Sequence, residues 1–507
     1  MSASATELNM SNQRRWWALT AAALVVLTVG LDGTILNTAL PTLAVDLHAS
    51  TADLQWINNA YILTMAIALL PAGLLGDRWG RKRVLVGGLI VFAAGSLLCA
   101  LSPTTGMLIL ARALLGVGAA ILISLCMSQV VVLFSPEERP TAVAIVTSAN
   151  LVGFPLGPIL GGVLLQHFDW GVIFLLNVPV VLFALVAVAL LIPESRNGLR
   201  SRLDAVGIGL TAIGIVGLSY GVINAGNVGW GDLFSIPLIA AGALALAVLV
   251  IWERWVERRR EPLIDMALFR SRDFVLGTLL ATIVSFAMFG VFFNVPQYLQ
   301  NIERVDALGT GLRLLPMVGG LVVGVLITSR LASRVRPTSP VIVGLALMTA
   351  GAVTGGLTTA SGYVVLATWM TVFGAGIGLA MTTTTAVAMR TLSAARAGSG
   401  SALMLTLRQI GSALGVAVLG TVVTTAYRDS IDHANLPSGT AATIRSSAAT
   451  GVAAARALHA DAAVAAAREA FLDGMSVSLL VCAAVSTGAL VITMLMLAAQ
   501  RRRDDAA

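Results

Sequence analysis

Residues Leu24–Leu40 read LVVLTVGLDGTILNTAL, an apolar run with one ionisable side chain, Asp32. The run overlaps an apolar stretch at residues 16–38, which is long enough to cross the hydrocarbon core of a bilayer as a helix. A charged Asp at the centre of such a helix costs about 2.5–3.5 kcal/mol on insertion scales, so it is rare and usually functional. We therefore take Asp32 as the first candidate for a group that binds a proton or a cation.

Apolar stretches of similar length recur along the whole chain, so the sequence predicts fourteen membrane-spanning helices. The predicted ranges are 16–38, 54–75, 84–102, 106–133, 141–165, 171–192, 204–224, 234–252, 274–297, 309–330, 339–358, 363–389, 400–426 and 474–498. The chain of 507 residues is 57% hydrophobic and only 11% charged, and a soluble fold of this size has no room to bury so much apolar surface. The expected fold class is an all-α polytopic membrane protein.

The basic side chains indicate which side of the membrane each loop faces. With the N-terminus inside, the inner segments hold 24 Arg and Lys residues and the outer loops hold five. This asymmetry predicts a multi-pass protein of the cell inner (plasma) membrane with both termini cytoplasmic. The basic residues are scattered between apolar segments, which argues against nucleic acid as a partner despite the net charge of +7.

A weak internal repeat suggests how the chain is divided. Leu75–Arg78, in the inner loop after the second span, aligns with Leu331–Arg334 in the inner loop after the tenth. Repeated halves are typical of secondary transporters, and matching spans one to six with spans nine to fourteen leaves two spans between the halves. The expected parts are a six-helix bundle at 1–200, two inserted central helices with a charged inner linker at 201–273, and a second six-helix bundle at 274–507 that includes a long outer loop at 427–473.

The loop between spans two and three reads GLLGDRWGRKR, Gly73–Arg83. It resembles the signature loop of the major facilitator superfamily, and the matching positions are Gly73, Asp77, Arg78, Gly80, Arg81 and Lys82. The resemblance implies a major facilitator fold, in which this loop acts as a latch between the two halves in the outward-facing state. The alternative interpretation is a basic loop that only fixes the membrane topology.

Span five contains GFPLGPILGG, Gly153–Gly162. It resembles the antiporter signature of the drug-exporting branch of the superfamily, and the matching positions are Gly153, Gly157, Pro158, Gly161 and Gly162. Glycines four residues apart give a helix a smooth face for close packing, and Pro158 removes a backbone donor and favours a kink. Together they suit an interface that seals and opens, and ordinary helix packing is the alternative.

Three further motifs extend the resemblance over nearly the whole chain. Span four contains LILARALLGVGAA with Arg112, which is similar to a superfamily motif whose arginine is linked to proton transfer. LDGTILNTALP, Leu31–Pro41, and RQIGSALG, Arg408–Gly415, resemble motifs of the fourteen-helix drug:proton antiporters. We expect Arg112 to lie beside Asp32 and stabilise its anionic form, with snorkelling of Arg112 to an interface as the alternative.

The resemblance implies a secondary active transporter and not an enzyme: a proton-coupled multidrug efflux antiporter that works by alternating access, driven by the proton gradient without a cofactor or metal. In this hypothesis Asp32 binds cargo and a proton in turn. The C-terminal half holds no embedded acid, so monovalent cationic or neutral lipophilic compounds are expected as cargo in preference to dications, and amphiphilic anions stay open. Candidate cavity residues are Asn37, Tyr61, Asn150, Asn177, Asn294, Arg408 and Gln409. For the Asn and Gln residues the alternative role is helix-to-helix hydrogen bonding, and for Tyr61 it is a place in the core or against lipid.

Other function classes fit the sequence less well. The only lysine, Lys82, lies in GRKR and cannot form the Gly-Lys-Ser/Thr motif of a phosphate-binding loop, which argues against an ATP-driven pump. The four histidines form no HExxH pair and no nucleophile–base set is evident, which argues against a membrane enzyme. An exporter of an endogenous lipid or a self-made antibiotic would look the same in this sequence. A proton-coupled importer shares the fold, although the span-five motif argues against it. The expected partners are small lipophilic substrates, protons and the lipid bilayer, and the expected oligomeric state is a monomer.

Overall fold

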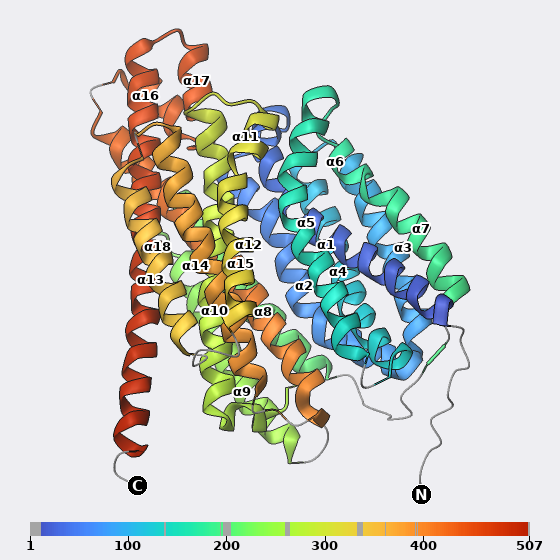
Figure 1. Ribbon diagram of the computed structural model, residues 1–507. Helices are drawn as coiled ribbons and strands as arrows, with labels where there is room; N and C mark the ends of the chain where they lie inside the picture. The colour runs from blue at the N-terminus through green and yellow to red at the C-terminus, as the bar shows by residue number, and fades with distance from the viewer. Residues whose placement is uncertain are drawn as a thin grey trace, which may run out of the picture.

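The computed structural model describes residues 12–135, 138–192, 194–195, 204–258, 264–331, 338–359, 361–390, 392, 394–434 and 436–504. Within these residues every regular element is a helix, and both termini lie at the same end of the molecule (Figure 1). The helices up to the middle of the chain are α1 Asn12–Asp46, α2 Thr51–Trp79, α3 Arg81–Ala100, α4 Thr105–Leu133, α5 Arg139–His167, α6 Val172–Leu175, α7 Asn177–Leu191, α8 Ala205–Val228 and α9 Ser235–Glu257. The remaining ones are η1 Met266–Arg270, α10 Arg272–Asn301, α11 Ala307–Arg313, α12 Leu315–Leu331, α13 Thr338–Leu357, α14 Tyr363–Arg390, α15 Ala394–Asp432, α16 Ser438–Arg445, α17 Gly451–Ala457 and α18 Asp461–Asp504.

Thirteen helical segments of the described chain are long and apolar enough to cross a membrane, and α5 makes a fourteenth when its two parts, bent by 41° after Phe154, count as one span. The predicted all-α polytopic fold is therefore confirmed. Two spans are broken, one between α6 and α7 and one between α11 and α12. Each break is followed within three residues by a proline, Pro179 or Pro316, whose missing N–H interrupts the helical hydrogen bonds.

The short connections carry the expected capping chemistry. Ser50 caps α2 in a capping box, because its hydroxyl accepts from the Asp53 backbone N–H and the Asp53 carboxylate accepts from the Ser50 backbone N–H. Gly80 joins α2 to α3 with φ of +105°, a backbone conformation that favours glycine. These two turns fix the directions in which α2 enters and leaves the membrane.

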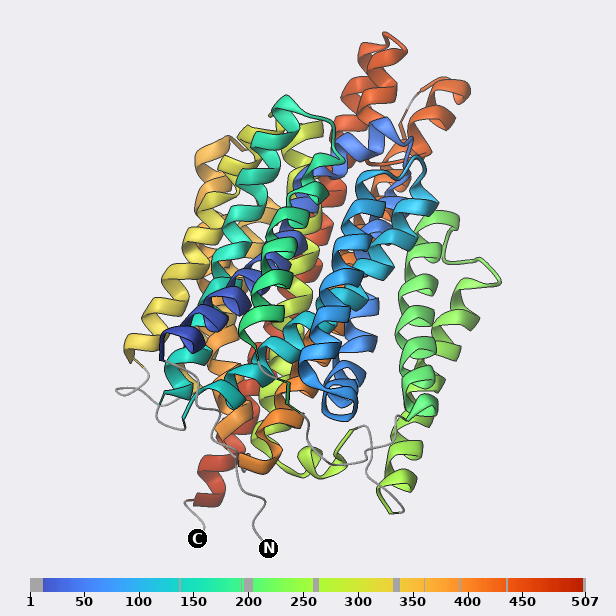
Figure 2. The ribbon, with the colours of Figure 1, turned by 90° about the vertical axis from the view of Figure 1, so that its right-hand side faces the viewer.

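The helices pack in two groups around two main clusters of buried apolar side chains. In the first group α1 packs along α5, and α4 packs against both α2 and α3. In the second, α14 packs against α12 and α13, and α15 packs against α10 and α18. The α8–α9 pair stands at the right-hand edge in Figure 2, and α8 also contacts α2 and α15. The predicted domain boundaries stay predictions, and residues 196–203 and 259–263 near them lie outside the described residues.

The two groups of helices meet at the end away from the termini. Gln55 of α2 donates to the backbone oxygens of Val416 and Ala417 on α15, at 3.1 and 3.0 Å. Gln300 of α10 donates to the backbone oxygen of Thr38 on α1 at 2.8 Å. With the predicted orientation of the termini, these contacts close the outer side of the molecule.

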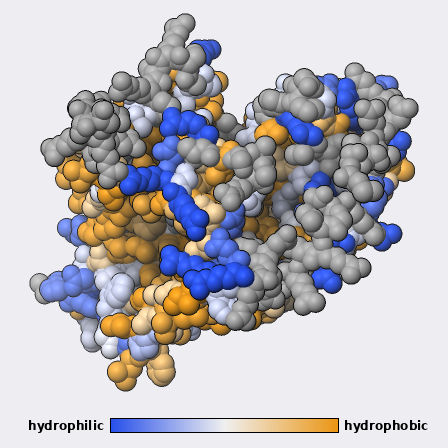
Figure 3. Space-filling model, turned by 90° about the horizontal axis from the view of Figure 1, so that it is seen from below, coloured by the Kyte–Doolittle hydropathy of each residue, from blue (hydrophilic) through white to orange (hydrophobic). Residues whose placement is uncertain are grey.

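The opposite end carries both termini and is viewed in Figure 3. Hydrophilic residues gather across the middle of this face, and hydrophobic ones lie mainly along its left and lower edges. This distribution fits an end that faces water beside a lipid-covered wall. Of the predicted repeat copy Leu331–Arg334 only Leu331 is described, at the end of α12, because 332–337 lie outside the described residues.

The segment predicted as a long outer loop, 427–473, is largely helical. The helix α15 continues to Asp432, α16 and α17 follow, and α18 begins at Asp461, so the last two spans are longer than the predicted 400–426 and 474–498. Figure 1 shows α16 and α17 stacked on the end away from the termini. The Thr51 hydroxyl on α2 lies 3.3 Å from the Ser447 hydroxyl, so this segment contacts the other group of helices.

Candidate functional site

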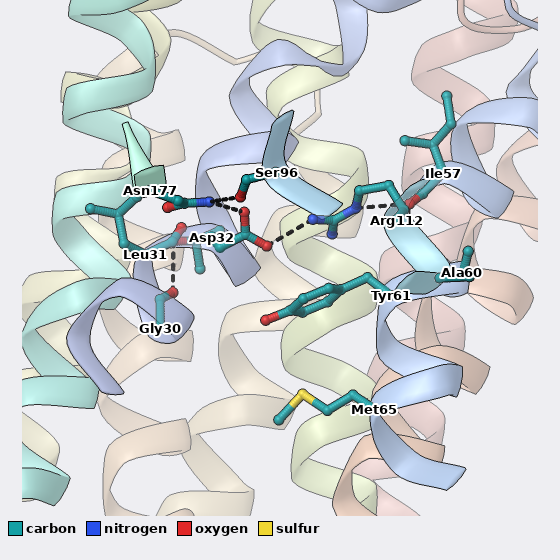
Figure 4. A network of polar contacts seen from close by, with 12 residues as sticks. Gly30, Leu31, Asp32, Ile57, Ala60, Tyr61, Met65, Ser96, Arg112 and Asn177 are labelled. Atoms are coloured by element: carbon teal, nitrogen blue, oxygen red, sulfur yellow. Dashed lines mark hydrogen bonds and ion pairs between the residues drawn. The ribbon is translucent and has the colours of Figure 1, made fainter. Parts of the chain in front are cut away.

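Asp32 lies inside the first group of helices and is fully buried. One carboxylate oxygen accepts from Arg112 Nη1 on α4 at 2.8 Å, and the other accepts from Asn177 Nδ2 on α7 at 2.8 Å (Figure 4). The Asn177 amide also donates to the Ser96 hydroxyl on α3 at 3.1 Å. Four helices thus contribute to one network, which holds the carboxylate between a cation and an amide.

Arg112 is also fully buried, so it does not snorkel to an interface. Its Nε donates to the backbone oxygen of Ile57 at 3.3 Å, and its guanidinium carbon lies 4.2 Å from the centre of the Tyr61 ring. A buried ion pair is stable only when both charges find partners, because desolvation costs several kcal/mol per ion. The structure therefore brings together the two residues that the sequence predicted as the coupling pair.

A cavity of about 370 Å³ lies between the two groups of helices. Its wall includes residues of α1, α2, α4 and α5 on one side and of α10, α12, α14 and α15 on the other, and it reaches Thr385 near the end of α14. Tyr61 lines this cavity, whereas Asp32 and Arg112 do not. Figure 4 shows the Tyr61 ring beside the ion pair, with Met65 one turn further along α2. Tyr61 is thus the side chain that contacts both the buried pair and the cavity.

The cavity wall is mainly apolar and polarisable. Phe154 of α5 and Phe289 of α10 meet edge to face across the two groups, with ring centres 6.3 Å apart. Thioethers of Met65, Met288 and Met381 add soft surface that adapts to different shapes. A volume within the 300–1,000 Å³ range of small-molecule pockets and an apolar lining with few polar groups suit a drug-sized cargo.

Three polar residues of α15 line the cavity, Arg408, Gln409 and Ser412, and the first two make the contacts that matter for the wall. Arg408 Nε donates to the Ser285 hydroxyl at 3.4 Å, and its Nη2 lies 3.5 Å from the Met381 sulfur. Gln409 Nε2 lies 2.9 Å from the Met65 sulfur on α2, so this contact joins the two groups of helices. Both residues belong to the RQIGSALG motif.

The predicted cavity residues divide into two sets. Tyr61, Asn150, Arg408 and Gln409 line the cavity, and Asn37, Asn177 and Asn294 lie elsewhere. Asn37 accepts from Asn58 at 3.1 Å, Asn177 donates to Asp32, and Asn294 donates to Ser478 at 3.1 Å. Each of these three amides is hydrogen-bonded to a neighbouring helix inside its own group, the alternative role that the sequence left open, and a part in binding cargo stays a prediction for them.

The GLLGDRWGRKR loop lies at the end that carries the termini. Arg81 pairs with Asp77 at 2.9 Å within the loop, and the Lys82 ammonium donates to the backbone oxygen of Ala189 on α7 at 2.7 Å. Glu194 accepts from the Lys82 backbone N–H at 3.1 Å, and Arg78 is exposed. Gly73 lies opposite the Ser124 hydroxyl on α4. Within the described residues, every ion pair and hydrogen bond of this loop stays in the first group of helices, and the latch role stays a prediction.

The glycines of span five face α1. A Cβ at Gly153 would lie 2.5 Å from the Leu27 backbone oxygen, and one at Gly161 would lie 2.8 Å from Ile35 Cγ1. At Gly157 it would meet the Thr34 hydroxyl, and at Gly162 it would lie 2.6 Å from the Ala307 oxygen of α11. The helices α1 and α5 therefore approach too closely for larger side chains, and Gly162 extends the close contact to the second group.

Pro158 explains a contact that the sequence analysis missed. Because Pro158 has no N–H, it cannot donate to the backbone oxygen of Phe154 one turn earlier. That oxygen instead accepts from the Thr34 hydroxyl of α1 at 3.1 Å. Thr34 and Ser96 are both small hydroxyl residues in apolar helices, a type too common in such helices to single out from the sequence.

The chemistry of the site is that of charge and hydrogen bonding. Within the described part of the chain, no group of three His, Cys, Asp or Glu side chains lies close enough together to hold a metal ion. The arrangement offers one buried carboxylate, its arginine partner and a separate cavity.

A family model described as Major Facilitator Superfamily matches residues 22–416. The chain belongs to the major facilitator superfamily. A crystal structure of a bacterial homolog of the human lysosomal transporter Spinster, in an inward-facing and unoccupied conformation, aligns with a TM-score of 0.65 and 18% identity over 96% of this chain and 99% of that chain. At this identity the likeness shows the fold alone.

Several curated relatives are similar over most of the chain. The Tetracenomycin C resistance and export protein of Streptomyces glaucescens is 34% identical over 431 residues, which cover 84% of this chain and 79% of the relative. Multidrug efflux pump LfrA of Mycolicibacterium smegmatis is 33% identical over 459 residues, which cover 88% of each chain. Puromycin resistance protein pur8 of Streptomyces alboniger is 34% identical over 436 residues, covering 84% and 86%. These names support efflux by a multi-pass membrane transporter of this superfamily and not an enzyme.

Proposed function

We propose that this protein exports lipophilic compounds, antibiotics among them, from the cytoplasm in exchange for protons, with Asp32 as the group that binds the proton. The observation that carries the proposal is a fully buried carboxylate, paired with Arg112, one side chain away from a drug-sized cavity. The relatives named for tetracenomycin C, puromycin and multidrug resistance support this cargo class.

Tyr61 provides the route by which the proton and the cargo affect each other. A deprotonated Asp32 holds Arg112 by a charge-assisted hydrogen bond at 2.8 Å, and the guanidinium stacks on the Tyr61 ring. Protonation removes the negative charge, so Arg112 loses its partner in a dry environment and must seek another acceptor. Movement of the guanidinium displaces the Tyr61 ring, which forms part of the cavity wall, and this changes the space for cargo.

This route differs from direct competition, in which cargo and proton would share Asp32. In the described conformation Asp32 does not line the cavity, so a bound molecule meets Tyr61 and not the carboxylate. The proposal therefore assigns Asp32 to the proton and the cavity to the cargo. Neutral lipophilic cargo fits this division, because none of the residues lining the cavity is an acid.

The conformational cycle follows from where the two groups of helices touch. Gln55 and Gln300 hold them together at the end away from the termini, which the charge distribution predicts to be outside. Opening that end requires these hydrogen bonds to break while the opposite end closes, as in rocking of two bundles around a central site. We propose that the loop with Asp77, Arg78 and Arg81 then contacts the second group. A proton that reaches Asp32 from the outer side promotes cargo release. Each unit of pH difference across the membrane contributes about 1.4 kcal/mol to the driving force.

Proteoliposomes test the proposal. The purified protein is reconstituted, a pH gradient is imposed, and accumulation of fluorescent lipophilic dyes and of puromycin is followed with and without an uncoupler. We expect gradient-driven accumulation by the wild-type protein and by Asp46→Asn, a control at the exposed end of the same helix. Asp32→Asn should show none while still binding the dyes. Uncoupler-resistant accumulation of the dyes by the wild-type protein would refute proton coupling. Full activity of Asp32→Asn would show that the coupling does not depend on Asp32.

A further inference from the structure

The cavity has an asymmetric charge. Of the residues that line it, Arg408 is the only one with a permanently charged side chain, and none is Asp or Glu. Arg408 lies on α15, about one helical turn after Leu405 and next to Gln409, and all three residues line the cavity. The cavity therefore carries a positive charge on one wall.

The contacts of Arg408 within the described residues do not neutralise it. The guanidinium has a hydroxyl at 3.4 Å and a thioether at 3.5 Å, and no described carboxylate lies within ion-pair distance. Both contacts are long and weak for a group with five N–H donors. Arginine in a membrane-spanning helix is costly and generally finds an acidic partner or water. Arg112 shows the contrast, because it reaches Asp32 at 2.8 Å.

Asp32 does not serve as the missing partner. It is fully buried, both of its oxygens already accept hydrogen bonds, and it lies outside the cavity lining. Among the described residues no acid complements Arg408, so a molecule that enters the cavity is a source of the negative charge.

We propose that Arg408 binds an acidic group of the cargo, a sulfonate, carboxylate or phenolate on an aromatic molecule. This rests on the proposed function and names the class of compound that the same cavity prefers. The planar guanidinium recognises such oxyanions with two parallel N–H donors, and the neighbouring amide of Gln409 is a further donor in the wall. The aromatic body of the cargo lies against Phe154 and Phe289, which come from opposite sides of the cavity.

The preference concerns charge, so probes of one shape and different charge test it. Purified protein in detergent is titrated with 1-pyrenesulfonate and with (1-pyrenylmethyl)trimethylammonium, without any pH gradient. We expect the sulfonate to bind at least tenfold more tightly than the ammonium compound. Arg408→Gln should weaken sulfonate binding at least tenfold, a change of about 1.4 kcal/mol, and leave ammonium binding equal or tighter. Arg408→Lys, which keeps the charge, should recover most of the sulfonate affinity.

Arg313→Gln is the matched control. Arg313 also lies in an apolar span of the second group, but it stacks on Tyr363 with 5.0 Å to the ring centre and does not line the cavity. The Arg313→Gln variant should bind both probes as the wild-type protein does. Melting curves of all variants show whether they are folded. Equal binding of the two probes, or a sulfonate affinity that Arg408→Gln leaves unchanged, would overturn the proposal. Because binding needs no gradient, that outcome would leave proton-coupled export standing, whereas sulfonate binding without gradient-driven transport would refute the proposed function alone.

Discussion

Removing Arg112 while leaving Asp32 in place should destabilise the protein strongly. In Arg112→Met the buried carboxylate keeps only the Asn177 amide at 2.8 Å and loses its cation. Breaking a buried ion pair by removing one partner costs about 3–5 kcal/mol, because the remaining charge is left desolvated. Since protonation of Asp32 would remove that charge, the destabilisation should shrink as the pH is lowered.

The double variant separates this cost from lost packing. Asp32→Asn combined with Arg112→Met leaves no unpaired charge, so we expect it to recover about 2 kcal/mol or more relative to Arg112→Met alone. Unfolding by sodium dodecyl sulfate in mixed micelles, followed by the fluorescence of the nine tryptophans, gives the free energies of unfolding. Costs of the two substitutions that simply add, with no recovery in the double variant, would refute the view that Asp32 and Arg112 act as one buried pair.

Three further predictions concern packing, conformation and energy coupling. Gly157→Ala should destabilise the α1–α5 interface by about 1–3 kcal/mol, because its Cβ would lie 2.9 Å from the Ile35 backbone nitrogen. Thermal melting should show no comparable loss of stability for Gly319→Ala, since a Cβ at Gly319 meets open space. Gln55→Ala removes two hydrogen bonds between the groups of helices, worth about 1–3 kcal/mol, so a cysteine introduced at the end away from the termini should be labelled faster. Gln297→Ala removes a hydrogen bond within its own helix and should leave that labelling rate unchanged. Export of a cargo with one negative charge in exchange for one proton moves two charges, so a membrane potential of 100 mV should add about 4.6 kcal/mol to the driving force. Exchange of a monovalent cation for a proton moves no net charge and should gain nothing from the potential. Transport rates in proteoliposomes under potassium diffusion potentials measure the difference.

The membrane-spanning segments could be predicted because hydropathy reports contact with lipid, which these helices share. Their ends could not, because a helix continues into water wherever its residues favour one. The helix α18 begins at Asp461, well before the predicted span at 474–498, in the Ala-rich stretch DAAVAAAREAF. Alanine has the highest helix propensity, so hydropathy misplaces the end while the helix itself is favoured.

The buried pair could be predicted because an acid and an arginine in apolar spans each need a partner. The neutral polar residues could not be assigned in the same way. Asn150 lines the cavity and Asn177 binds Asp32, yet both are single amides in apolar helices. Which of them faces the cavity depends on the rotation of each helix about its axis and on the position of the second group of helices. The local sequence determines neither of these. Arg408 shows the same limit, because the sequence gives its charge but not that its side chain faces the cavity.

Infrared difference spectroscopy on the purified protein tests most directly whether Asp32 takes up the proton. The account predicts a carboxylic-acid band from a buried site that grows as the pH falls, shifts when cargo is added, persists in Asp46→Asn and is missing in Asp32→Asn. A band that survives unchanged in Asp32→Asn, or a wild-type protein in which cargo leaves that band unaltered, would contradict it.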